Sequence, residues 1–152
     1  MKFSGREDIK VAQDAVYAHL TDFATHERAA LRRGVVVNRI DGLQHVGPGM
    51  TWVGKTKFRG KQRNVTLELL ALDPCDLLSY RLDGGGLAGT FDIELMALSK
   101  SRTRMNVALE VRPKNLTGRL LMQSLRILKP TLNKRFRARL ASVAGGIEEG
   151  LK

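Results

Sequence analysis

Residues 87–112 read LAGTFDIELMALSKSRTRMNVALEVR and contain two segments in which apolar and polar side chains alternate. Because successive side chains of a β-strand point to opposite faces, this period of two predicts two strands, each with one apolar face. The turn-forming residues 99–101 between them predict a hairpin. The apolar set consists of Phe91, Ile93, Leu95, Met105, Val107, Leu109 and Val111.

The same alternation precedes this hairpin in segments 51–59, 64–72 and 77–83. Short turn-like connections rich in Gly, Pro and Asp separate the segments, which predicts consecutive hairpins and excludes a doubly wound parallel sheet. We expect the Gly84–Gly86 run to form a flexible hairpin tip. The inward-facing set consists of Trp52, Gly54, Thr56, Phe58, Val65, Leu67, Leu69, Leu78, Tyr80 and Leu82.

The two ends of the chain surround these strands with helical patterns. Residues 3–11 predict a first strand, and residues 12–33 predict two short helices with a break and cap at Thr21-Asp22 and an end at Gly34. After Pro113 the pattern is helical, with a kink or break expected at Pro130. The fold class predicted is α+β: a curved antiparallel sheet of about seven strands whose concave face is covered by a long C-terminal helix.

Composition narrows the kinds of protein this can be. At 152 residues, the chain predicts one domain spanning residues 1–152. One cysteine and three scattered histidines exclude a disulfide scaffold and a zinc finger, and there is no G-x-G-x-x-G or G-x-x-x-x-G-K-[ST] motif, so we expect no metal and no cofactor. A charged N-terminus and the lack of a long apolar run predict a cytoplasmic protein.

Element order and several local stretches resemble the START-like superfamily, also called SRPBCC, over nearly the whole chain. The stretches are VGPGMTW at 46–52, LDP at 72–74, LLSYRL at 77–82, GTF at 89–91, RTRM at 102–105 and the ending rich in Leu and Arg. Within that superfamily, the sequence is similar to the polyketide cyclase/dehydrase and lipid-transport group. The resemblance implies a helix-grip fold with a cavity for apolar molecules such as lipids, sterols, polyketides or plant hormones.

If the inward set faces such a cavity, these side chains and the C-terminal helix would line it; the alternative is that they fill a solid core. Arg63 has inward parity at a strand entrance, where it would hold a carboxylate or phosphate at the cavity mouth or be solvated. The predicted ligand-binding residues are Trp52, Thr56, Phe58, Arg63, Val65, Leu67, Leu78, Tyr80, Phe91, Ile93, Met105, Val107, Leu109, Leu132, Phe136 and Leu140.

Two functions follow from this lining. The first is binding or carriage of a hydrophobic small molecule; the rival is a cyclase or aromatase enzyme in which Tyr80, Thr56 and Arg63 orient a polyketide-like substrate. No catalytic residue is assigned, because the histidines are predicted to be surface residues and Cys75 an inert thiol between acidic neighbours. Asp92 and Glu94 are expected to pair with arginines of the next strand.

The charge is concentrated near the C-terminus. The formal net charge is +11, and the segment 114–152 contributes more of it than the other three quarters of the chain. Three interpretations stay open: a solubilising face, docking on an anionic membrane, and nucleic-acid binding, the last weakened by the scarcity of outward aromatics. Outward Leu70, Leu77 and Met96 leave open whether the protein forms a homo-oligomer.

Overall fold

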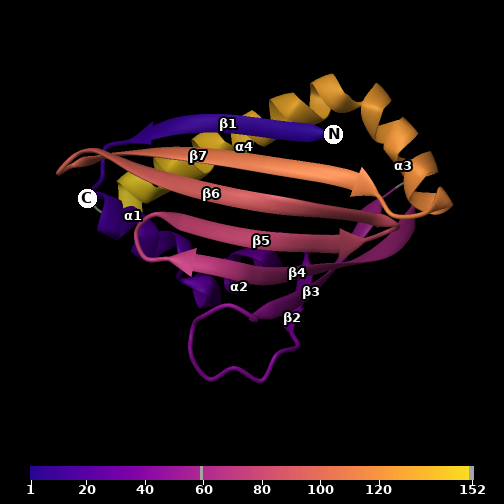
Figure 1. The fold of residues 1–152 in the computed structure, drawn as a ribbon, viewed down its shortest axis with the longest axis horizontal. Helices are drawn as coiled ribbons and strands as arrows, with labels where there is room; N and C mark the ends of the chain where they lie inside the picture. The colour runs from indigo at the N-terminus through magenta and orange to yellow at the C-terminus, as the bar shows by residue number, and fades with distance from the viewer. Residues whose placement is uncertain (59, 151–152) are drawn as a thin grey trace.

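The structure, a computed structural model, describes residues 1–58 and 60–150, without the side chain of Phe58. One antiparallel sheet of seven strands has the order β1-β7-β6-β5-β4-β3-β2, so the first strand pairs with the last (Figure 1). The elements are β1 (Lys2–Ile9), α1 (Gln13–Leu20), α2 (Phe23–Arg32), β2 (Val36–Arg39), β3 (Thr51–Phe58), β4 (Lys61–Asp73), β5 (Leu77–Gly84), β6 (Leu87–Ser99), β7 (Arg102–Pro113), α3 (Leu116–Ile127) and α4 (Lys129–Gly150). The predicted architecture is confirmed.

The register of the sheet agrees with the alternation in the sequence. Trp52 lies opposite Leu67 and Tyr80 lies opposite Phe91, so these apolar side chains share one face. Register shifts between Leu69 and Ala71 and between Ala97 and Ser99 interrupt the ladders. Such bulges increase the local bend of a strand, which helps the sheet to curve around the helices.

The helices begin and end close to where the sequence predicts. Asp22 caps α2 by accepting a hydrogen bond from the Thr25 amide, and Gly34 follows the helix with a positive φ of 80°. The C-terminal helical segment is divided at Leu128, so the predicted break is present. It falls two residues before Pro130, because proline fits the first turn of a new helix, where its missing amide hydrogen is not needed.

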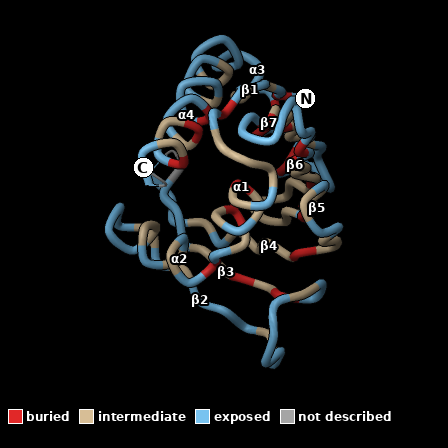
Figure 2. Tube along the Cα trace, turned by 90° about the vertical axis from the view of Figure 1, so that its left-hand side faces the viewer, coloured by how far each residue is buried: buried red, intermediate tan, exposed pale blue. Residues whose placement is uncertain are grey.

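The core lies between the sheet and α4, which crosses one face of the sheet (Figures 1 and 2). Phe3 of β1 contacts Phe136 of α4, with ring centroids 6.0 Å apart. A Cβ on Gly5 would collide with Leu140, so this glycine allows α4 to approach β1 closely. The largest fully buried side chains are Ile9, Val16, Met50, Leu69, Leu78, Thr103, Met105 and Ile147.

The β5–β6 turn corrects the expectation of a flexible tip. Gly85 and Gly86 adopt positive φ, and the Lys114 amide donates to the Gly86 carbonyl oxygen over 2.7 Å. A Cβ on Gly118, in the first turn of α3, would overlap that same oxygen. The tip is therefore packed against the start of α3.

The ion pairs expected between Asp92 or Glu94 and arginines of the next strand are not present among the described residues. Asp92 accepts a hydrogen bond from Ser79 over 2.5 Å, and Arg104 pairs with Asp8 of β1 over 2.9 Å. The register explains the difference, because Glu94 lies opposite Asn106 rather than an arginine. No helix among the described residues is long and apolar enough to span a bilayer.

Candidate functional site

A cavity of about 410 Å³ lies between the sheet, α2 and α4. Its floor comes from the inner face of the strands, and the two helices form its sides. Most of its lining is aliphatic or aromatic. The lining residues are Leu20, Phe23, His26, Glu27, Ala30, Val37, Trp52, Leu67, Tyr80, Phe91, Ile93, Met105, Val107, Phe136, Arg139, Leu140 and Val143.

The structure brings nine of the residues predicted from the sequence together around this cavity. They are Trp52, Leu67, Tyr80, Phe91, Ile93, Met105, Val107, Phe136 and Leu140. The sheet register explains why these side chains lie together. On adjacent strands Leu67 is opposite Trp52, Phe91 is opposite Tyr80, and Val107 is opposite Ile93. That they contact a ligand stays a prediction.

The other predicted residues do not line the cavity. Thr56 is exposed near the end of the β3–β4 hairpin, and Leu78 is buried in the packed core. Val65, Leu109 and Leu132 are half-buried elsewhere, and the side chain of Phe58 lies outside the described residues. The alternation therefore assigned the strand residues among them to the concave face of the sheet, but the cavity occupies only part of that face.

Arg63 lies at the other end of the sheet from where its predicted role would need it. Its side chain runs beside Gly85 and close to Leu121 of α3, and it is absent from the cavity lining. The Nε atom is buried without a hydrogen-bond partner among the described residues. Arg63 therefore does not line this cavity, and its Nε is not solvated.

Tyr80 supplies a polar group in the apolar floor. The residue is buried, and its hydroxyl has no hydrogen-bond partner among the described residues. Burial raises the pKa of this phenol well above its usual value, so it stays a neutral donor at any physiological pH. Within the described part, Arg63 Nε is the one fully enclosed side-chain polar atom without a partner, so the Tyr80 oxygen borders open space in the cavity.

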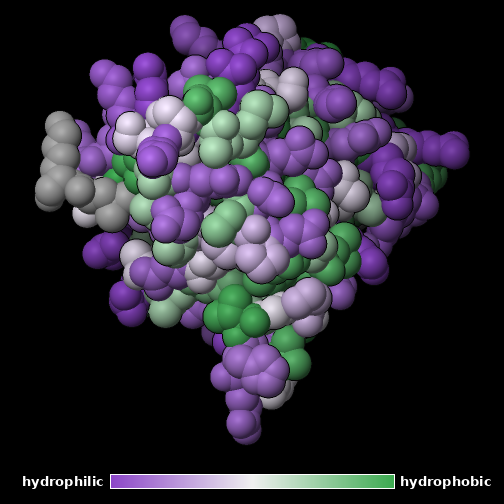
Figure 3. Space-filling view, turned by 60° about the vertical axis from the view of Figure 1, so that its left-hand side comes forward, coloured by the Kyte–Doolittle hydropathy of each residue, from purple (hydrophilic) through white to green (hydrophobic). Residues whose placement is uncertain are grey.

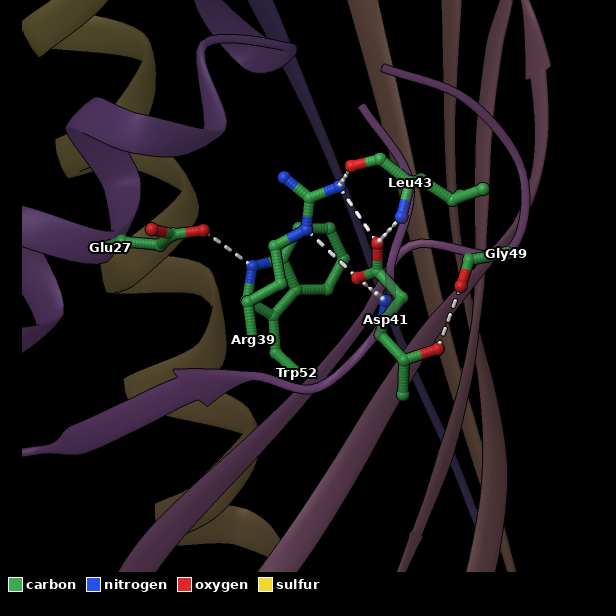
Figure 4. Close-up of polar contacts among 7 residues, drawn as sticks. Glu27, Arg39, Asp41, Leu43, Gly49 and Trp52 are labelled. Carbon is green, nitrogen blue, oxygen red and sulfur yellow. Dashed lines mark hydrogen bonds and ion pairs between the residues drawn. The ribbon is translucent and has the colours of Figure 1, made fainter. Parts of the chain in front are cut away.

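Helix α2 contributes the largest group of residues that the sequence analysis did not assign. Phe23, Glu27 and Ala30 line the cavity at positions i, i+4 and i+7 of this helix. The Trp52 indole Nε1 donates a 2.7 Å hydrogen bond to Glu27 Oε1 (Figure 4). The ring centroids of Trp52 and Phe23 are 5.2 Å apart. The helical spacing was visible in the sequence, but nothing there showed that this stripe faces Trp52.

The exposed residues His26 and Arg139 mark the open side of the cavity, between α2 and α4. Arg139 makes no ion pair with any residue that the structure describes. Although Arg139 is exposed, nearby protein atoms partly desolvate its guanidinium and lower its pKa, and the positive charge of Arg33 lowers it further; an arginine still stays charged at neutral pH. An unpaired guanidinium beside a second cation favours an anionic group at this mouth.

The loop between β2 and β3, residues 40–50, borders the strand that carries Trp52. Asp41 accepts hydrogen bonds from Arg39 over 2.8 Å, from the Thr51 amide over 2.9 Å and from the Leu43 amide over 3.0 Å (Figure 4). These donors, Arg39 above all, hold the pKa of Asp41 well below its usual range. The loop projects from the body, with hydrophobic side chains near its base (Figure 3).

Comparison with known proteins identifies the fold. No protein-family profile matches the chain, and no curated protein does. The Zhui aromatase/cyclase from Streptomyces sp. R1128 has a TM-score of 0.73 at 15% identity, covering 100% of this chain and 96% of that one. Norcoclaurine synthase from Thalictrum flavum, solved in complex with dopamine and hydroxybenzaldehyde, has a TM-score of 0.69 at 13% identity, covering 99% and 86%.

A third similar structure is Ara h 8.0201, with a TM-score of 0.62 at 15% identity, covering 98% of this chain and 95% of that one. At these identities the likeness is one of fold. The chain therefore has the helix-grip fold that the sequence predicted.

Proposed function

We propose that this protein binds a hydrophobic small molecule in the cavity between the sheet, α2 and α4. The observation that carries the proposal is the cavity itself: about 410 Å³ of space with an almost wholly apolar lining. Sites for small ligands are typically concave, of a few hundred Å³, and lined by apolar side chains with a few polar groups that set orientation. This cavity fits that description.

The polar groups define the ligand further. The Tyr80 hydroxyl offers a hydrogen bond in the floor, and Arg139 offers a positive charge at the mouth. We infer an amphipathic ligand with an apolar body, a hydrogen-bond acceptor near Tyr80 and a carboxylate or similar anion near Arg139. Glu27 accepts the hydrogen bond of the Trp52 indole and forms no ion pair with Arg139 among the described residues, so the Arg139 guanidinium stays available to an anion.

The first experiment is native mass spectrometry of the protein as purified from cells, compared with its denatured mass. A discrete additional mass that is lost on denaturation is expected. Binding is then measured by the fluorescence of Trp52, which is the only tryptophan in the chain and lines the cavity. The probes are dodecanoate and dodecanol, which share an apolar chain and differ in charge.

Cavity-filling variants give the decisive test. Leu67→Trp and Val107→Trp place bulk inside the cavity and are expected to weaken binding at least tenfold, because they occupy the ligand volume. Val36→Trp is the matched control, since Val36 is exposed while its neighbour Val37 lines the cavity. Native mass spectrometry is the readout, because the added tryptophans would confuse fluorescence. Unchanged binding in both cavity variants would contradict the proposal.

A second candidate function is a cyclase-type enzyme, and the partnerless Tyr80 hydroxyl favours it. A neutral donor in an apolar cavity can polarise a substrate carbonyl. Of the three residues predicted for this role, Tyr80 alone lines the cavity, since Thr56 and Arg63 lie elsewhere. This reaction predicts that Tyr80→Phe lowers kcat far more than it weakens substrate binding, whereas equal losses would support simple binding.

A further inference from the structure

Helix α3 has apolar side chains on two opposite sides. Its inner side, with Leu121 and Met122, is buried against the body of the protein. Its outer side carries Leu116, Leu120 and Ile127, whose exposed fractions are 71%, 57% and 82%. Spacings of four and seven residues place these three on one line along the helix, about 16 Å long at 1.5 Å per residue.

Nothing among the described residues covers this outer side. Figure 1 shows α3 at the end of the molecule away from α1 and α2, and Figure 2 shows that most of it is exposed. The helix is firmly placed, because Gly118 packs on Gly86 and the Asn115 side chain caps the Gly118 amide over 2.9 Å. The apolar stripe of Leu116, Leu120 and Ile127 is therefore a fixed feature of the surface.

Positive charge surrounds the stripe. Arg119 and Arg126 are exposed, lie on one flank of it, and form no ion pair with any residue that the structure describes. From residue 111 to residue 147 the chain has no acidic residue, while it has nine basic ones. These are Arg112, Lys114, Arg119, Arg126, Lys129, Lys134, Arg135, Arg137 and Arg139.

We propose that α3 docks on an anionic lipid membrane, with the apolar stripe at the boundary between headgroups and acyl chains and the arginines against the headgroups. An exposed apolar line beside cations is the pattern of helices that lie in a membrane interface. A second copy of this chain fits less well, because twofold packing of the stripe would bring Arg119 and Arg126 against their own counterparts. A nucleic acid would leave the three aliphatic side chains without a role.

The test is flotation of the purified full chain with vesicles of phosphatidylcholine alone or mixed with phosphatidylglycerol. Binding to the mixed vesicles that weakens with added salt is expected. Ile127→Ser with Leu120→Ser should weaken it at least tenfold, and Arg119→Gln should weaken it about fivefold. Leu98→Ser is the control, since Leu98 is also exposed, at 41%, but lies on β6.

Three results would overturn the proposal. They are equal binding to neutral vesicles, unchanged binding in the double serine variant, and a dimer in sedimentation velocity that the serine variant abolishes. Circular dichroism checks that the variants fold, which is expected because the changed side chains are exposed. The outcome is separate from that of the cavity, because Leu67→Trp should leave vesicle binding unchanged.

Discussion

The two ends of the concave face are built from the same alternating strands and yet differ in packing. At the α3 end, Gly86 and Gly118 bring the β5–β6 turn and the helix into direct backbone contact. At the α2 end, larger side chains such as Phe23 and Trp52 hold helix and sheet apart around about 410 Å³ of space. Strand alternation decides which side chains face inward, and the residues of the helices decide whether those side chains meet.

Each end of the concave face has one arginine, and the two arginines differ in their surroundings. Arg63 lies beside Gly85 at the closed end, where its Nε is buried without a partner among the described residues. Arg139 lies at the open end, where solvent or a ligand can reach it. The same side chain is thus a packing element at one end and a candidate recognition group at the other.

The closed end should be the more sensitive to added volume. Gly118→Ala would place a Cβ on the Gly86 carbonyl oxygen. Because that oxygen belongs to the backbone, the clash can be relieved only if α3 moves. We expect the free energy of unfolding in urea to fall by about 3 kcal/mol. Gly145→Ala in α4 is the matched control, because nothing lies within 4 Å of its added Cβ. Since alanine favours a helix over glycine, its free energy of unfolding should rise by about 1 kcal/mol. Equal effects of the two changes would refute the tight contact.

The open end should be sensitive to charge rather than to volume. Arg139→Gln is expected to weaken dodecanoate binding about tenfold and to leave dodecanol binding unchanged, because only the carboxylate can pair with the guanidinium. Trp52 fluorescence measures both affinities. Arg63→Gln serves as the control and should change neither. A loss of affinity for both probes in Arg139→Gln would point to a packing role instead.

The contrast between the ends also explains what the sequence could and could not predict. Period-two alternation was enough to place Trp52 and Tyr80 on the inner face, because strand geometry is local. Thr56 has the same parity as Trp52, yet it is exposed, since the reach of the helices along the strand is a tertiary property. The sequence analysis did not assign Glu27 and Arg139 to the cavity for the same reason, because helical periodicity does not determine which strand a helix packs against.

Removing the partly buried guanidinium of Arg63 should stabilise the closed end. Arg63→Met keeps much of the side-chain volume while deleting a buried polar atom that has no partner among the described residues. The free energy of unfolding is expected to rise by about 1 kcal/mol in urea denaturation. A fall of similar size would show that Arg63 is held by an interaction worth more than its burial costs. Either sign leaves the cavity end unaffected, so dodecanoate affinity should not change.

The smallest effect concerns the loop beside the open end. The Arg39 guanidinium and two amides lower the pKa of Asp41, so its ionised form contributes stability that is present above about pH 4 and is lost only as pH falls through the lower folded-state value. Asp41→Asn should therefore be less stable than the wild type at neutral pH, and the gap should close only in strong acid. Urea denaturation of both proteins across this range measures the gap. If the stability difference instead disappeared at the pKa of an ordinary aspartate, the ionised Asp41 would not be stabilised by the Thr51 and Leu43 amides. These hydrogen bonds would then not fix the loop beside the cavity.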